Sequence, residues 1–312
     1  MRVFVAGATG AIGRPLVQML VQAGHETFGL ARSNAAAKQV RRLGATPVSA
    51  DALDREALVA AIAEVRPEAV VHQLTAIPQA LDPKRIDVQF ELTNRLRTEG
   101  TRNLLEGWRA AGGRLFVAES IAFAYDPEGE GLRTEHHPLW RRPPRTFEDI
   151  LAAVRDLEAQ VGDAGGAVLR YGHLYGTGTR LAGDGGTTGQ VRQGRFPVVG
   201  SGGAVFSFTH VEDAAGAAVR AVEAGARGVF NIVDDDPAPA CEWLPELARQ
   251  LAAPAPGQVP VAQALEAVGE WGVAYQTELV GASNARAKQE VGWRPIHPTW
   301  RTAMVPEPAG GQ

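Results

Sequence analysis

Short apolar runs alternate with longer amphipathic stretches along the first 175 residues of the chain. The apolar runs are nearly continuous, which is typical of parallel strands covered by helices on both faces. We therefore expect an α/β fold: a Rossmann-like, doubly wound parallel sheet with a smaller C-terminal substrate-binding lobe. The longest connecting helix is expected at about 83–112, because this stretch ends in the sequence AAGG, a natural helix stop. The predicted strands are 2–7, 26–31, 46–50, 69–74, 114–120 and 166–171.

The pattern changes after residue 175. Residues 176–203 are rich in glycine and predict loops with one short helix. A helix and a strand follow within 211–233, and we expect both to return to the main sheet. The predicted organisation is a dinucleotide-binding Rossmann domain, a mainly substrate-binding lobe and a flexible tail, at 1–175, 176–305 and 306–312.

Composition and charge narrow the class of protein. The chain has 312 residues, 45% of them hydrophobic and 21% charged, with a net charge of −4 and no basic run. This balance argues against partners such as nucleic acid or a membrane surface. Cys241 is the only cysteine, so no internal disulfide can form. No apolar run approaches the roughly 20 residues of a membrane-spanning helix and no signal-peptide pattern follows Met1, so a cytoplasmic protein is expected.

A glycine-rich turn follows the first strand in the sequence RVFVAGATGAIGR. Glycine is required where a backbone turns sharply, approaches a pyrophosphate or lets a helix pack closely on a strand. The next helix would offer free N–H groups and the positive end of its dipole to phosphates. A plain strand-to-helix turn is the alternative interpretation. The residues predicted to bind a dinucleotide here are Gly7, Thr9, Gly10, Ala11, Ile12 and Gly13.

The end of the second strand indicates which dinucleotide is bound. A chain that binds NAD usually has Asp or Glu there, but this chain has Arg32 and Ser33. A guanidinium and a hydroxyl group suit a ribose 2′-phosphate, so NADP (NADPH) is favoured and NAD is the alternative. Asp51 is placed either at the adenine amino group or in a turn. The remaining predicted cofactor contacts are Ala52, Leu74, Thr75 and Ala76.

Several sequence blocks together resemble the extended or atypical short-chain dehydrogenase/reductases, including the NAD-dependent epimerase/dehydratase group. The resemblance implies a nicotinamide cofactor, a Ser or Thr that orients the substrate, matched here by Ser120, and a Tyr-x-x-x-Lys pair on the next helix. In that pair the Tyr transfers a proton, while the Lys lowers the pKa of the Tyr and holds the nicotinamide ribose. The blocks are GATGAIGR, VVHQLTA, GTRNLLE (100–106), LRYGHLYGTGT (169–179), FSFTHVEDAAGA (206–217) and VGWRP (291–295).

The helix expected to carry that pair does not contain it. Residues 146–161 read TFEDILAAVRDLEAQV, an amphipathic pattern with an apolar stripe, and no Tyr and Lys in the chain have the required spacing. Depending on the register, Ile150 and Val154 or Phe147 and Leu151 occupy the two positions. We therefore interpret the pair as replaced by apolar residues.

Other residues are candidates for the chemistry. Tyr171 is the best proton donor that the protein itself offers, with a packing role as the alternative. His173 is expected beside the nicotinamide and the substrate, and His136 at the border of the substrate cleft or in a surface pair. Phe206 stands where sugar-nucleotide members carry an Arg for the diphosphate, which favours an apolar or aromatic substrate. No His, Asp or Glu cluster has metal-ligand spacing, so no metal site is expected.

These features predict an NADPH-dependent ketoreductase that acts on a polycyclic aromatic ketone. A general acid usually contributes about 10²–10⁴-fold, so hydride transfer can persist without the Tyr–Lys pair when cofactor and carbonyl are well aligned. The proton would come from Tyr171, from water or, as we favour, from a phenol of the substrate. The pattern resembles the angucyclinone ketoreductases of antibiotic biosynthesis, the simocyclinone type in particular. The alternatives are a non-catalytic NADP-binding regulatory protein and a sugar-nucleotide epimerase or dehydratase; a monomer or homodimer is expected.

Overall fold

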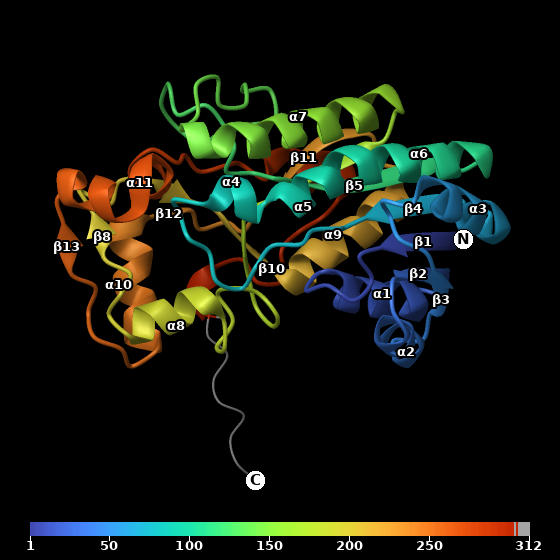
Figure 1. Cartoon of the computed structure of the whole chain (residues 1–312), viewed down its shortest axis with the longest axis horizontal. Coiled ribbons are helices and arrows are strands. Elements are labelled where there is room, and N and C mark those ends of the chain that lie inside the picture. Colours follow the sequence, from blue (N-terminus) through green and yellow to red (C-terminus); the bar gives the residue numbers. More distant parts are fainter. Residues whose placement is uncertain (303, 305–312) are drawn as a thin grey trace, which may run out of the picture.

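The computed structural model describes residues 1–302 and residue 304, and its centre is a seven-stranded parallel sheet (Figure 1). The strand order is β11-β6-β5-β4-β1-β2-β3. This is the doubly wound sheet that the apolar runs predict, so the expected fold class is confirmed. The strands are β1 (Arg2–Ala6), β2 (Glu26–Ala31), β3 (Thr46–Ser49), β4 (Ala69–His72), β5 (Leu115–Ile121), β6 (Ala167–Tyr171) and β11 (Gly228–Ile232).

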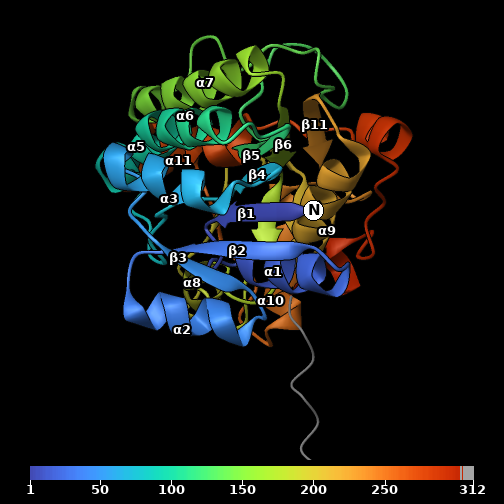
Figure 2. The ribbon, with the colours of Figure 1, turned by 90° about the vertical axis from the view of Figure 1, so that its right-hand side faces the viewer.

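The position of strand β1 between two layers of helices explains why its sequence is continuously apolar. Alternate side chains point to opposite faces of the sheet, and helices cover both faces (Figure 2). Val3 and Val5 belong to the core under α1, α2 and α9, whereas Phe4 belongs to the core under α3, α6 and α7. The covering helices are α1 (Gly13–Gln22), α2 (Asn34–Arg42), α3 (Arg55–Val65), α6 (Thr101–Ala110), α7 (Glu148–Asp163) and α9 (Val211–Ala224).

The connection between β4 and β5 differs from the single helix predicted at about 83–112. The predicted stop is present, because Gly112 adopts a φ of +70° that favours glycine. Within the connection, however, a π-helical turn carries the side chain of Arg97 into the interior, and the residue as a whole is 1% exposed. The parts are α4 (Ile86–Gln89), α5 (Glu91–Arg95), the π turn η1 (Leu96–Gly100) and α6.

After β6 the chain builds a smaller lobe and returns twice to the sheet domain, first through α9 and β11 and later through the turn η3 (Ala287–Val291), which packs on both. Strand β11 pairs with β6, and α9 packs on α1, so the segment 211–233 lies in the sheet domain. The rest forms the lobe on the left of Figure 1, where α11 is kinked at Gly269. Its elements are β7 (His173–Tyr175), α8 (Gly186–Arg192), β8 (Val198–Val199), β9 (Val205–Phe206), β10 (Phe208–His210), β12 (Ala238–Pro239), α10 (Ala240–Gln250), β13 (Gln258–Val259) and α11 (Val261–Thr277). Three short helical turns complete the chain: η2 (Arg145–Phe147), η3 (Ala287–Val291) and η4 (Trp300–Thr302).

The order of the strands reverses at β1, which has β2 on one side and β4 on the other. In open α/β sheets, ligands bind at the carboxyl ends of the strands beside such a reversal. The glycine-rich turn follows β1 and the segment around Leu74 follows β4, so the fold brings both to this crevice.

Two expectations concern the membrane and the tail. Within the part of the chain that the structure describes, no helix is both long and apolar enough to cross a membrane. The tail predicted at 306–312 lies outside the described residues.

Candidate active site

A cavity of about 930 Å³ opens at the carboxyl ends of the strands. One half is lined by the glycine-rich turn and the end of β2. The other half is lined by aromatic side chains of the lobe, among them Phe206, Trp243 and Trp271. This volume lies at the upper end of the range for ligand pockets, and the two halves form one continuous space.

The glycine-rich turn has the geometry that a dinucleotide requires. Gly7 has a φ of +95°, and a Cβ there would lie 2.6 Å from the carbonyl oxygen of Gln73. A Cβ at Gly13 would lie 2.0 Å from the carbonyl oxygen of Gly7, so helix α1 can start this close to β1 only with glycine. Ile12, the N-cap residue, makes no side-chain capping bond, and the first turn of α1 contains no acidic residue. The positive end of the helix therefore faces the cavity without a competing anion.

The predicted contacts for the adenosine end lie near one another. Arg32, Ser33 and Ala52 line the cavity. The Arg32 guanidinium is 3.9 Å from the Asp51 carboxylate, and both side chains are about half exposed, at 58% and 46%. Ser33 Oγ accepts a hydrogen bond from the N–H group of Ala36 and caps α2, which leaves the hydroxyl proton free to donate.

Two predicted cofactor contacts do not line the cavity, although Leu74 and Thr75 do. Asp51 accepts a hydrogen bond from the N–H group of Leu53 at 2.9 Å, which is the turn geometry that the sequence offered as its alternative. Ala76 donates its N–H to Thr93 Oγ1 at 3.0 Å and packs in the core instead. Local hydrogen bonds of this kind involve neighbours that the sequence pattern does not identify.

Helix α7 and the last residue of the preceding turn η2 present apolar side chains to the cavity. Phe147 and Ile150 are among the lining residues, and Leu151 and Val154 are buried in the adjoining core. The ring of Phe147 stacks on Trp271, with centroids 4.0 Å apart. The two possible placements of the Tyr–Lys pair on this segment therefore both put apolar side chains at the Tyr position and at the Lys position.

The hydroxyl group of Ser120 already donates a hydrogen bond within the protein. Ser120 Oγ donates to Glu158 of α7 at 2.7 Å. The Arg170 guanidinium holds the same carboxylate through bonds of 2.8 and 2.6 Å and donates to the hydroxyl oxygen of Tyr125. Tyr125 in turn donates to Asn231. Ser120 can accept a hydrogen bond from a ligand, but its own proton points to a carboxylate.

Tyr171, the candidate proton donor, lines the cavity but is 2% exposed. Its hydroxyl oxygen accepts from the Gln73 amide at 3.1 Å, and its proton is directed to the carbonyl oxygen of Ala214 at 3.4 Å. Burial raises the pKa of this phenol well above its usual value. These contacts fit the packing role that the sequence left open and make Tyr171 a weak acid.

His173 and Phe206, the residues predicted to face the substrate, line the aromatic half of the cavity. The His173 ring stacks on Phe123 with centroids 4.4 Å apart and lies 4.5 Å from the Phe206 ring. Burial lowers the pKa of His173 to about 3, so the imidazole is neutral. His136 is exposed and is not among the lining residues, because its loop lies on the surface.

The structure adds an ion pair that the sequence analysis missed. Arg97 of η1 donates to Glu119 of β5 through two bonds of 2.9 and 3.2 Å, and both side chains line the cavity. Their exposed fractions are only 2% and 7%. The one sequence signal for such a pair was a charged residue, Glu119, within the mainly apolar strand sequence LFVAESI.

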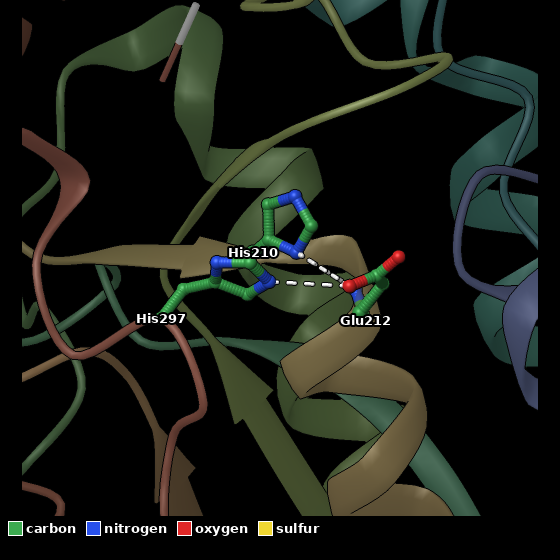
Figure 3. Close-up of side chains that lie close together, drawn as sticks. All are labelled: His210, Glu212 and His297. Carbon is green, nitrogen blue, oxygen red and sulfur yellow. Dashed lines mark hydrogen bonds and ion pairs between the residues drawn. The ribbon is translucent and has the colours of Figure 1, made fainter. Parts of the chain in front are cut away.

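A second cluster lies outside the cavity lining, where His210, Glu212 and His297 meet at the start of α9 (Figure 3). Their ligand atoms all lie within 4.8 Å of one another, a set that suits a divalent cation, although the sequence spacing predicted none. Glu212 Oε2 is 3.1 Å from His297 Nε2 and 3.8 Å from His210 Nδ1. His210 Nδ1 also accepts from the N–H group of Glu212, so it already serves as the N-cap of α9.

The sheet, the glycine-rich turn and the adjoining cavity define an enzyme of the dinucleotide-dependent oxidoreductase class. The chain belongs to the NAD dependent epimerase/dehydratase family, whose model matches residues 3–233. This finding confirms the resemblance to the extended short-chain dehydrogenase/reductases.

Several individual relatives are named reductases. A protein of Streptomyces sp named 3-diazoavenalumate denitrifying reductase is 48% identical over 308 residues, which cover 97% of this chain and 99% of the relative. A 4-hydroxy-2-methyl-3-oxo-4-farnesyl-3,4-dihydroquinoline-1-oxide ketoreductase of Stigmatella aurantiaca is 29% identical and covers 92% of this chain and 84% of its own. Among solved structures, the UDP-glucose 4-epimerase of Thermus thermophilus in complex with NAD is 26% identical with a TM-score of 0.71, over 95% of this chain and 94% of that one.

Proposed function

We propose that the protein is an NADPH-dependent reductase that replaces the diazo group of an aromatic substrate with hydrogen and releases dinitrogen. The observation that carries the proposal is that both candidate acids already donate their protons to other groups of the protein. Ser120 donates to Glu158, and Tyr171 directs its proton to a backbone carbonyl. The relative that is 48% identical is named for a denitrifying reduction of a diazo compound, which supports the same reaction type.

The proton balance distinguishes this reaction from ketone reduction. A ketone takes up a hydride and a proton to become an alcohol, and a positioned acid usually accelerates that step by about 10²–10⁴-fold. Replacing the diazonium form of a diazo group by hydrogen consumes one hydride, breaks the carbon–nitrogen bond, releases dinitrogen and consumes no proton. A reduced nicotinamide supplies the hydride when it is bound. An active site without a free acid therefore suits the diazo group better than the ketone.

The residues of the cavity would bind the cofactor and exclude water from the reacting groups. The glycine-rich turn and the first turn of α1 would hold the pyrophosphate, while Leu74 and Thr75 would contact the ribose. Arg32 and Ser33 would hold a 2′-phosphate, which favours NADP over NAD. The apolar face of α7 at Ile150 would exclude water, which matters because water competes with hydride for a diazonium ion.

The test is a turnover assay with isotopic labelling. Purified protein is given deuterium-labelled NADPH and diazotised 3-amino-4-hydroxybenzoate, and the product is analysed by mass spectrometry. We expect loss of NADPH absorbance together with one deuterium on the ring carbon that bore nitrogen. A product without the label, or NADPH that is not consumed, would contradict the proposal.

Reduction of an aromatic ketone is the second candidate, because the Stigmatella relative is named a ketoreductase. The proton would then come from a phenol of the substrate, as in an angucyclinone-like ketone whose hydroxyl lies beside the carbonyl. The assay is repeated with 8-hydroxy-1-tetralone and its methyl ether. Turnover of the phenol but not of the ether, with the diazo compound unchanged, would select this candidate.

We do not propose the other two alternatives. A regulatory NADP-binding protein would need no substrate-sized apolar space at the nicotinamide end, whereas aromatic side chains line such a space here. A sugar-nucleotide enzyme needs a diphosphate clamp, and the buried ring of Phe206 stands at the position expected for it.

A further inference from the structure

Arg180 is a cavity-lining arginine that carries its charge without a carboxylate partner. It follows the turn after β7 and is half-buried, and this partial burial lowers the pKa of its guanidinium below the usual value. Among the described residues its side chain makes one hydrogen bond, from Nε to the carbonyl oxygen of Gln79 at 3.3 Å. No Asp or Glu within residues 1–302 forms an ion pair with it.

Three fully buried arginines, by contrast, all have hydrogen-bonding partners within the protein. Arg97 and Arg170 each hold a carboxylate through two hydrogen bonds. Arg133 has no carboxylate, but its three nitrogens donate to six backbone carbonyls. A cation that is partly removed from water without such partners has lost hydration and gained little in return. Arg180 therefore has capacity for an anion that the protein does not supply.

The surroundings of Arg180 indicate what that anion is attached to. Arg180 lines the cavity together with His173 and Tyr275. Its positive charge adds to the lowering of the pKa of His173 and opposes the rise that burial causes in the pKa of Tyr275. The Tyr275 ring lies 5.0 Å from Phe206 at an angle of 87°, and the stacked pair of His173 and Phe123 stands beside them. Such walls fit the faces and edges of a flat, conjugated molecule.

We propose that Arg180 binds the carboxylate of the substrate, so that the substrate is a flat aromatic acid held by its carboxylate in the lobe. The planar fork of a guanidinium matches the two oxygens of a carboxylate. The proposal rests on the proposed function in one respect only: the reacting group of the substrate is placed in the nicotinamide half of the cavity. Binding of the acid itself does not depend on that reaction.

The carboxylate site is tested first by binding, without turnover. Trp243 and Trp271 line the cavity, so ligand titration can be followed by tryptophan fluorescence. The probes are 4-hydroxycinnamate and its methyl ester, with wild type, Arg180→Gln and Arg180→Lys. We expect Arg180→Gln to weaken binding of the acid on the order of 100-fold and to leave the ester nearly unchanged, with Arg180→Lys in between.

The matched control is Arg195→Gln, which removes the same charge from an exposed arginine that lines the same cavity. We expect it to change the affinity for the acid by less than about threefold. Equal losses for acid and ester, or equal losses in the two variants, would overturn the proposal. If Arg180 instead held a phosphate of the cofactor, Arg180→Gln would weaken NADPH binding and spare the acid, which also overturns it. Normal acid binding without diazo turnover would reject the proposed function alone.

A stability measurement separates binding from a structural role. Arg180→Gln is expected to keep or raise the Tm of the ligand-free protein, because it removes a partly desolvated charge that no carboxylate compensates. A lower Tm would mean that the charge supports the fold, and would count against the carboxylate site.

Discussion

Ser120 donates its hydroxyl proton to Glu158 across 2.7 Å, and this bond ties strand β5 to helix α7. Glu158 lies on the helix where the family resemblance places a Tyr–Lys pair, and Arg170 holds the same carboxylate through two further bonds. An ionised carboxylate only accepts hydrogen bonds, so the proton of Ser120 has a fixed direction. One face of α7 thus anchors the sheet through polar bonds, while its apolar face closes the cavity.

The first prediction concerns the two candidate acids. Ser120→Ala, Tyr171→Phe and the double variant are each expected to keep kcat for a diazo substrate within about tenfold of wild type, because neither hydroxyl supplies a proton. The measurement is steady-state kinetics with Tm as a check on folding. A fall of about 10²-fold or more in folded Tyr171→Phe alone would assign the acid to Tyr171.

The second prediction concerns the choice of cofactor. Arg32→Ala should raise the KM for NADPH by about 10–100-fold, since charge-assisted bonds to a phosphate are worth roughly 1.5–3 kcal/mol. The KM for NADH should change by less than about twofold. Arg42→Ala, an exposed arginine of the neighbouring helix α2, is the control and should affect neither. Equal effects on both cofactors would show that Arg32 does not contact a 2′-phosphate.

The third prediction concerns the buried ion pair beside the cavity. Arg97→Met leaves Glu119 buried without its partner and should lower the free energy of unfolding by about 3–5 kcal/mol. The double variant with Glu119→Leu should regain most of this loss, because no buried charge remains. Urea denaturation followed by circular dichroism measures both.

The exposed pair of Arg95 and Glu99 is the comparison for that measurement. Arg95→Gln should hardly move the urea midpoint, because water screens an exposed pair. Similar shifts for Arg95→Gln and Arg97→Met would contradict the view that burial makes the inner pair important.

The fourth prediction concerns stability in acid. Burial lowers the pKa of His72 to about 4, of His173 to about 3 and of His210 to about 4, from 6.5 in each case. Between these values the unfolded chain binds more protons than the folded one. The free energy of unfolding should therefore be fully present above about pH 6.5 and fall as the pH drops toward 4, by up to about 1.4 kcal/mol per pH unit for each such histidine. His72→Gln should flatten the slope, and a slope of the opposite sign would refute the assignment.

The sequence alone determined the features that depend on local pattern. Continuous apolar runs predicted the strands, because a strand buried on both faces needs apolar side chains on both. Gly7 and Gly13 predicted the dinucleotide turn, since the backbone there leaves no room for a Cβ. The apolar stripe of α7 and the missing Tyr–Lys spacing could be read directly. The π turn that divides the predicted 83–112 helix could not, because nothing local marks it.

Only the tertiary structure decided which polar groups meet. Glu119 and Arg97 are 22 residues apart, Ser120 and Glu158 are 38 apart, and His210 and His297 come from different ends of the lobe. The sequence contains more carboxylates than buried arginines, so it cannot say which arginine is left without one. The packing of the chain determines which polar groups lie within hydrogen-bonding distance. A side chain that has lost its contact with water can pair only with the groups that the fold places beside it. Arg180 lines the cavity half-buried and receives no carboxylate partner from residues 1–302, and our proposal that it binds the substrate is based on this.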